Sequence, residues 1–360
     1  MDKSLSEPKH SGRMEAIDFL RGFAILEMFA SHFDIFFPSL LAKLIDYTET
    51  AMALFVLLAG FMIGRQYFPA FLRDPWRITR RLWIRALQIC VVQYIIIATV
   101  NIPLHIIGYE RVGRGEGLLL FVFKSAAFLN QIGIVHILPT FIPLFLMSPL
   151  ILFLFRARLD WVVYAASICM FTVGNVRPHL FDLGDPAIFP IIVIQIYFIA
   201  GCAWGRWAYG NGRLEPRALN GWFIASCAAF IAVMILVRGK IVPGRIISFH
   251  PLNVFGLLYQ APIILTVVLG TLRFWRPIRS MFFYPWIALL GRHALLAFVL
   301  HLYCVKAVGV LNFLASVPAF ANYLLVLASV ALVILVLGRY ESHDRTDGGG
   351  WVRALDAVFK

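Results

Sequence analysis

The chain has 360 residues, of which 61% are hydrophobic and 14% charged, and its mean hydropathy is +0.83. This composition excludes a soluble globular protein, and the long continuous apolar stretches disfavour a β-barrel, so we expect an all-α, polytopic integral membrane protein. The formal net charge of +13 does not indicate nucleic-acid binding, because Lys and Arg gather at the ends of apolar segments, where they set topology.

About ten apolar segments are each close to the ~20 residues that a helix needs to cross the hydrocarbon of a bilayer. They are residues 17–37, 48–68, 80–101, 132–155, 159–176, 188–208, 219–237, 253–274, 285–305 and 321–338. The connections after the second, fourth, sixth and eighth segments are basic, which predicts that both termini are cytoplasmic. We therefore divide the chain into a cytoplasmic segment (1–16), a ten-helix transmembrane domain (17–338) and a cytoplasmic tail (339–360).

The first segment carries five ionisable side chains in otherwise apolar sequence: Asp18, Arg21, Glu27, His32 and Asp34. A charge near the bilayer centre costs at least ~2.5 kcal/mol, so a helix that served only as an anchor would not carry them. At 100° per residue, Asp18, Arg21 and His32 lie within about 60° of one another, while Glu27 and Asp34 lie opposite. The first helix is therefore predicted to face a polar cavity or another helix along one stripe.

The third segment begins with a helix start and an arginine stripe. Asp74 is a good N-cap and Pro75 suits the first helical position. Arg77, Arg81 and Arg85 follow at four-residue spacing and cover about 80° of one helix face.

Arg21 and Arg292 are expected at a depth comparable to that of the stripe. Arginine binds phosphate through paired N–H donors, so Arg21, Arg81, Arg85 and Arg292 are our candidates for holding a phosphorylated cofactor presented from the cytoplasm. Two simpler interpretations remain open. The stripe could contact lipid headgroups, and Asp18 could neutralise Arg21 one turn away.

A second polar layer is expected in the outer half of the membrane. His32 lies about 22 Å along the first helix, and His301 about 24 Å along a ninth helix that starts near Pro285. Glu49 and His136 fall at a similar depth near the starts of two further helices. Histidine titrates nearest to neutral pH, so this layer is a candidate general-base site. The alternative is that these histidines only hydrogen-bond between helices.

Four motifs in chain order carry a resemblance to a known family. They are EAIDFLRGFAILEMFASHF (15–33), ALFVLLAGFMIG (53–64), HILPTFIPLFLMSPLILFL (136–154) and LLGRHALLAFVLH (289–301). The first resembles the opening helix of the OpgC family, with an acid, an Arg-Gly pair and a histidine at Asp18, Arg21, Gly22 and His32. More distantly, the chain is similar to the wider acyltransferase-3 class of membrane enzymes.

The resemblance implies transfer of an acyl group, such as succinyl or acetyl, from a cytoplasmic acyl-CoA to a hydroxyl of a periplasmic glucan or other envelope glycan. It also implies the bacterial inner membrane as the location, with lipids and the glycan as partners. In this interpretation His32 is the general base or takes the acyl group transiently, His301 or Glu49 polarises it, and His136 lies on the acceptor side. Succinyl-CoA or acetyl-CoA would be the donor, and no metal is expected.

Two other classes of protein fit the same residues. A transporter or flippase for an anionic metabolite or lipid-linked substrate would use the basic cavity without covalent chemistry. Internal repeats or paired broken helices would indicate it, but the prolines of the fourth segment have no matching partner. A non-catalytic membrane scaffold is disfavoured, because ionisable residues within spans usually serve a task.

Overall fold

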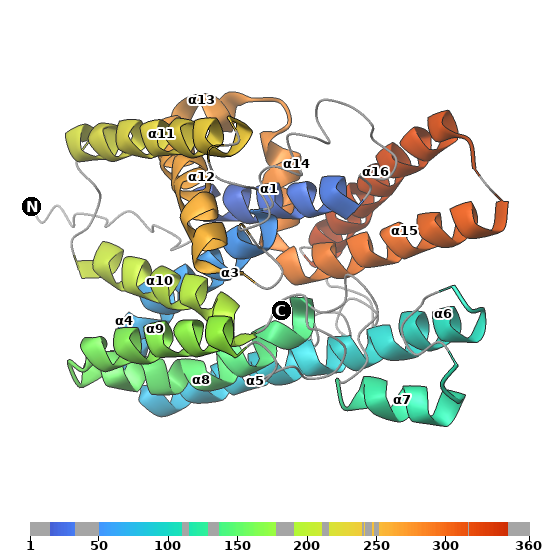
Figure 1. Ribbon diagram of the computed structural model, residues 1–360, viewed down its shortest axis with the longest axis horizontal. Helices are drawn as coiled ribbons and strands as arrows, with labels where there is room; N and C mark the ends of the chain where they lie inside the picture. The colour runs from blue at the N-terminus through green and yellow to red at the C-terminus, as the bar shows by residue number, and fades with distance from the viewer. Residues whose placement is uncertain are drawn as a thin grey trace, which may run out of the picture.

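The structure is a computed structural model (Figure 1). It describes residues 15–32, 50–109, 115–128, 137–177, 191–210, 216–239, 241, 247, 252–315 and 317–344. The helices in these ranges are α1 (Glu15–His32), α3 (Ala51–Met62), η2 (Ile63–Tyr67), α4 (Phe68–Arg73), α5 (Pro75–Ile96), η3 (Ile97–Asn101), α6 (Ile102–Ile106), α7 (Leu118–Ala126), α8 (Ile137–Arg156), α9 (Asp160–Val176), α10 (Ile191–Gly210), α11 (Pro216–Arg238), α12 (Val254–Arg273), α13 (Trp275–Ser280), α14 (Tyr284–Arg292), α15 (Ala294–Ala315) and α16 (Ala319–Asp344). The two η elements are π-helical turns that continue the helices around them.

The described residues form a helical bundle with no β-strand, which confirms the all-α prediction. Among these residues, eight helical stretches are long and apolar enough to cross a membrane, and α9 is a shorter apolar helix. Each of the ten predicted segments contains at least one helix. The chain is therefore a multi-pass membrane protein.

The ninth predicted segment was wrong in one respect, because 285–305 is not a single helix. α14 ends at Arg292, His293 leaves helical geometry with φ −111° and ψ 42°, and α15 starts at Ala294 in a new direction (Figure 1). No proline marks the break, so apolar periodicity could not reveal it. The last helix also runs further than expected, to Asp344 rather than to residue 338.

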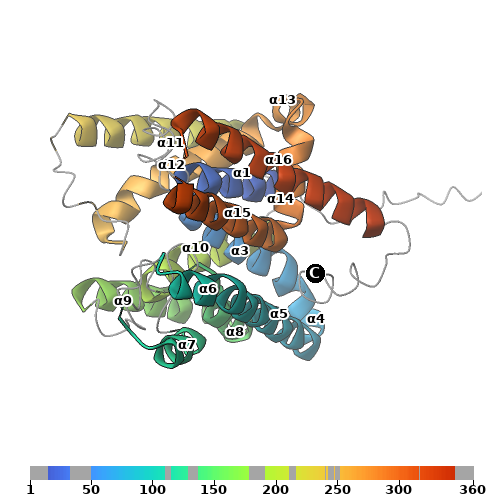
Figure 2. The same ribbon diagram turned by 90° about the vertical axis from the view of Figure 1, so that its right-hand side faces the viewer.

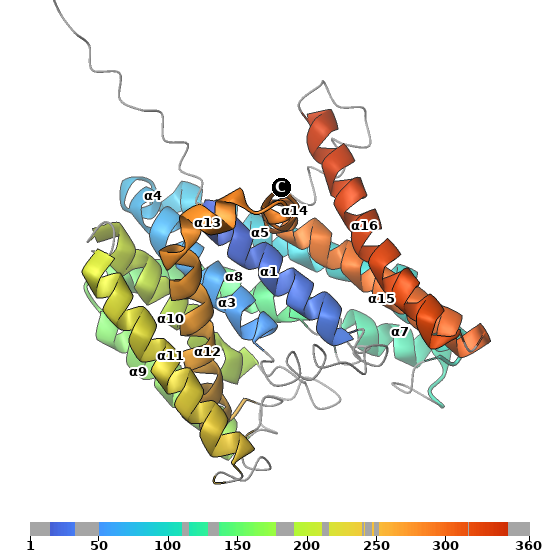
Figure 3. The same ribbon diagram turned by 90° about the horizontal axis from the view of Figure 1, so that it is seen from above.

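α1 lies at the centre of the bundle in all three views (Figures 1, 2 and 3). It packs against α14 and α3, while α11, α12 and α13 lie on one side of it and α15 and α16 on the other. The helical span Ala51–Arg73, which begins with α3, is well buried, with 72% of its most apolar stretch inside the protein, whereas the corresponding value for Leu219–Val237 of α11 is only 6%. α11 is thus a peripheral helix whose apolar side chains face lipid.

Small residues allow α3 and α10 to pack closely against each other. A Cβ at Gly60 would lie 2.0 Å from the carbonyl oxygen of Phe198, and one at Gly201 would lie 2.1 Å from that of Leu57. Such close backbone approach is typical of small-xxx-small crossings in membranes. The crossing fixes α3, which forms one wall of the cavity described next.

Candidate active site

A cavity of about 520 Å³ lies between α1, α3, η2, α5, α8 and the α14–α15 break. All four arginines predicted to hold a cofactor line it: Arg21, Arg81, Arg85 and Arg292. They come from three helices that are far apart in sequence. The cavity therefore collects cationic side chains that the sequence alone could only place at a similar depth.

The arginines of α5 reach the cavity because of where that helix begins. The carboxylate of Asp74 accepts a hydrogen bond of 3.0 Å from the backbone N–H of Arg77, which confirms the predicted N-cap. From this start, Arg81, Arg85 and Gln88 fall on the cavity side. Arg77, the first residue of the predicted stripe, is exposed and does not line the cavity.

A crossing of α1 and α14 determines the positions of the two other arginines, Arg21 and Arg292. A Cβ at Gly22 would lie 1.8 Å from the carbonyl oxygen of Ile287, and one at Gly291 would lie 1.6 Å from that of Asp18. Arg21 directly precedes the first glycine and Arg292 directly follows the second. The Arg-Gly and Gly-Arg pairs of the sequence are thus two halves of one contact that places both guanidinium groups at the cavity.

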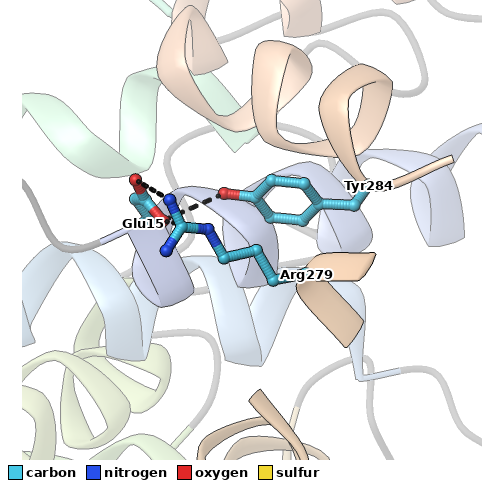
Figure 4. Close-up of polar contacts among 3 residues, drawn as sticks. All are labelled: Glu15, Arg279 and Tyr284. Atoms are coloured by element: carbon cyan, nitrogen blue, oxygen red, sulfur yellow. Dashed lines mark hydrogen bonds and ion pairs between the residues drawn. The ribbon is translucent and has the colours of Figure 1, made fainter. Parts of the chain in front are cut away.

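The start of α1 is also fixed to α13 and α14 (Figure 4). The Glu15 carboxylate forms an ion pair with Arg279, whose Nη2 donates to it at 3.5 Å, and accepts from the Tyr284 hydroxyl at 3.4 Å. The ring of Phe19 stacks on that of Tyr284 with a centroid distance of 6.1 Å. These contacts hold α1 along α14 within two turns of Arg21.

The rest of the cavity wall is mixed. The π-helical turn η2 contributes Gln66 and Tyr67, and such turns are frequent at functional sites. Aromatic and aliphatic side chains cover the remainder, including Phe55, Phe141 and Phe298. The cavity therefore combines a cationic region with an apolar one, as a ligand with an anionic end and a slim uncharged arm would require.

The two predicted histidines meet beside the apolar region. His32 Nδ1 and His301 Nε2 are 2.8 Å apart. His301 is completely buried, and the rings of Phe29 and Phe298 pack on it with centroid distances of 4.6 and 5.5 Å. Phe298 also lines the cavity, so this residue contacts both the cavity and the histidine pair.

The hydrogen bonds of His301 determine which nitrogen of His32 can act as a base. His301 Nδ1 lies 3.2 Å from the carbonyl oxygen of Phe298, which can only accept, so Nδ1 carries the proton. With the ring taken as neutral, Nε2 is then the acceptor. His32 Nδ1 must therefore donate to it, which leaves the lone pair of a neutral His32 on Nε2.

The remaining polar residues of the predicted site divide into two groups. Glu27 is buried and accepts hydrogen bonds from the backbone N–H of Thr50 at 3.0 Å and from its hydroxyl at 2.9 Å, so it links α1 to the start of α3. Glu49, His136 and Asp34 lie outside the described residues. In the described part of the chain, no group of three or more His, Cys, Asp or Glu side chains is placed to hold a metal ion.

Sequence reasoning missed several residues at the cavity. Gln88 continues the face of Arg81 and Arg85, so extension of the stripe by one turn would have found it. Gln66 and Tyr67 depend on a π-helical turn, which apolar periodicity does not reveal. The sequence also did not indicate the contact between Arg292 and Glu341, because 49 residues separate them. Arg292 Nη2 donates to the Glu341 carboxylate at 2.7 Å.

A family model described as "Acyltransferase domain" matches residues 14–339. The match covers most of the chain, including every helix that lines the cavity. The chain therefore belongs to the acyltransferase-3 family, which supports a membrane acyltransferase function in general terms. No match was found among curated proteins or among solved structures.

Proposed function

We propose that this protein is a membrane-embedded O-acyltransferase that moves an acyl group from acyl-CoA to a hydroxyl of a periplasmic glucan or other envelope glycan. The observation that carries the proposal is the meeting of four arginines in one cavity whose apolar end adjoins a pair of hydrogen-bonded histidines. The cytoplasmic side for the arginines and the bacterial inner membrane as the location are part of the proposal.

In this proposal the arginines bind the phosphates of the donor. Arg81 and Arg85 form the centre of the site, with Arg21 and Arg292 on the opposite wall. Arg21 and His32 are eleven residues apart on α1, which corresponds to about 17 Å. The pantetheine arm of the donor would span this gap along the aromatic wall and bring the thioester to Phe298.

In the proposed chemical step, His32 accepts one proton and then releases it. Its Nε2 accepts the proton of the acceptor hydroxyl while the hydroxyl oxygen attacks the thioester carbonyl carbon. A C–O bond forms, the C–S bond breaks, and the departing thiolate takes the proton from the imidazolium. His301 orients His32 and fixes its tautomer, as the second group of a catalytic pair commonly does.

Other parts of the site rest on the expected depths of the side chains and on the family resemblance. Glu49 is proposed as a further partner of the histidine pair and His136 as a contact of the acceptor. The acyl group is proposed to be small, with acetyl and succinyl as the first candidates, and CoA is the only cofactor invoked. The partners are then the glycan acceptor and the surrounding lipids.

Sealed proteoliposomes with a single orientation test the proposal. Acetyl-CoA labelled in its acetyl group is added to the side of the arginine cavity, and glucan oligosaccharides are enclosed in the lumen. We expect the label on the enclosed glucan, while the freed CoA thiol stays on the donor side. Label that reaches the lumen as intact acetyl-CoA would instead identify a transporter.

A further inference from the structure

The end of α16 packs on the break between α14 and α15. Tyr340 is 1% exposed, and its ring makes an edge contact with His293 at a centroid distance of 5.1 Å. One residue later, the Glu341 carboxylate accepts from Arg292 Nη2 at 2.7 Å. The two side chains of this ion pair are 24% and 26% exposed, so both are largely withdrawn from solvent. The C-terminal helix thus contacts both residues of the break.

Arg292 has more donors than this contact uses. A guanidinium group carries five N–H donors in a fixed planar fork. Glu341 takes one through Nη2, while Nε is buried and has no hydrogen-bond partner within the described ranges. Because Arg292 also lines the cavity, an oxyanion bound there could accept the remaining N–H groups after a small side-chain shift.

We propose that Glu341 is a positioning residue that holds the Arg292 guanidinium in the cavity wall, so that its other N–H groups can bind an oxyanion of the donor. The inference rests on the proposed donor site and adds a residue of α16 to it. Glu341 does not touch the donor in this account. It acts by restricting a long, flexible side chain to one orientation before the ligand arrives.

The opposite effect is also physically reasonable, and the sign of the result distinguishes the two. A carboxylate next to an anion site repels the ligand, so a Glu341 that acts only through its charge would weaken donor binding. Its removal would then tighten binding. If Glu341 acts by positioning, its removal weakens binding although the local charge becomes more favourable.

The test measures binding of acetyl-CoA and of inorganic pyrophosphate to the full-length protein in nanodiscs. Glu341→Ala is expected to raise the dissociation constant of acetyl-CoA about tenfold. Glu341→Gln keeps an oxygen acceptor for Arg292 and should recover part of the loss. Glu116→Ala is the matched control, because Glu116 is also 24% exposed, pairs with Lys124 and does not line the cavity.

A double-mutant cycle tests whether Glu341 acts on donor binding through Arg292. In an Arg292→Ala background, the removal of Glu341 should have no further effect on binding, because the group that it positions is gone. Additive losses, unchanged binding or tighter binding in Glu341→Ala would each overturn the inference. If the wild-type protein binds pyrophosphate in a Glu341-dependent way but not acetyl-CoA, the proposed function fails and the positioning role stands.

Discussion

The arginine cavity and the histidine pair are adjacent but physically different. The cavity gathers four guanidinium groups around open space, where an anionic ligand can neutralise them. In the histidine pair, His301 has no exposure at all and packs against Phe29 and Phe298. In the function proposed above, the cavity binds the donor and the histidine pair performs the chemistry. Substitutions should therefore separate the two effects.

The largest effect is expected at His32. Without its base, His32→Ala should lose about 10²- to 10⁴-fold in the rate of acyl transfer, the usual contribution of general-base catalysis. The dissociation constant of the donor should remain within twofold of wild type, which is a change of at most roughly 0.4 kcal/mol in the free energy of binding. Steady-state transfer and direct binding, measured on the same preparation, provide the check.

Ser31→Ala is the matched control for this change. Ser31 precedes His32, and its hydroxyl donates only to the carbonyl oxygen of Met28 at 3.0 Å among the contacts described. It should transfer at the wild-type rate. If His32→Ala transfers at that rate too, the assignment of catalysis to the histidine pair is wrong.

The second effect concerns binding alone. Arg85→Gln should weaken acetyl-CoA binding by about 1.5–3 kcal/mol, the value of hydrogen bonds to a charged group. Arg77→Gln, on the same helix but exposed and outside the cavity, should change it little. Isothermal titration calorimetry with acetyl-CoA measures the free energy of binding for both variants. Equal losses of binding in the two variants would mean that the arginines attract the donor through the overall positive charge of this face of the protein and not through the cavity.

A smaller effect is expected at His301. In His301→Ala the Nδ1–H of His32 loses its acceptor, so the free ring can adopt the wrong tautomer. Loss of a buried hydrogen-bond partner costs about 1–3 kcal/mol, and we expect it in kcat rather than in KM. A pH profile is the measurement that distinguishes this role from packing. His301→Asn, which retains a polar side chain, should recover part of the rate, whereas recovery by Phe would indicate packing alone.

The smallest effect on transfer is expected at the crossing that connects the two regions. Gly22→Ala forces a Cβ against the carbonyl oxygen of Ile287, and such overpacking costs about 1–3 kcal/mol of stability. Transfer by the protein that remains folded should fall only a few-fold through displacement of Arg21. Thermal unfolding in detergent measures the first quantity.

Gly338→Ala is the control for that variant, since a Cβ there meets nothing within 4 Å. It should unfold at or slightly above the wild-type temperature, because alanine favours the helix. Equal melting temperatures for Gly22→Ala and Gly338→Ala would show that the α1–α14 crossing is not tightly packed.

Much of this arrangement could be predicted from local patterns. The spacing of Arg81 and Arg85 gives a shared helix face, and the N-cap at Asp74 gives the start of that helix. Counting residues along α1 placed His32 far from Arg21. These inferences need only helix geometry, so they transfer directly from sequence to structure.

The rest depends on contacts between distant segments. The break at His293 carries no proline, and the approach of Gly291 to α1 that accompanies it is a tertiary contact. Glu341 falls in what composition indicated to be a tail, yet α16 carries it to Arg292. A single sequence contains no periodic signal for such contacts.

The most direct test of the central claim is binding of acetyl-CoA and succinyl-CoA to the purified protein in nanodiscs, with wild type compared to Arg81→Gln and His32→Ala. The account predicts saturable binding that weakens in Arg81→Gln and is unchanged in His32→Ala. If neither compound binds, the proposed donor cavity is contradicted. If binding is lost in His32→Ala but not weakened in Arg81→Gln, the donor cavity is not separate from the proposed catalytic histidine.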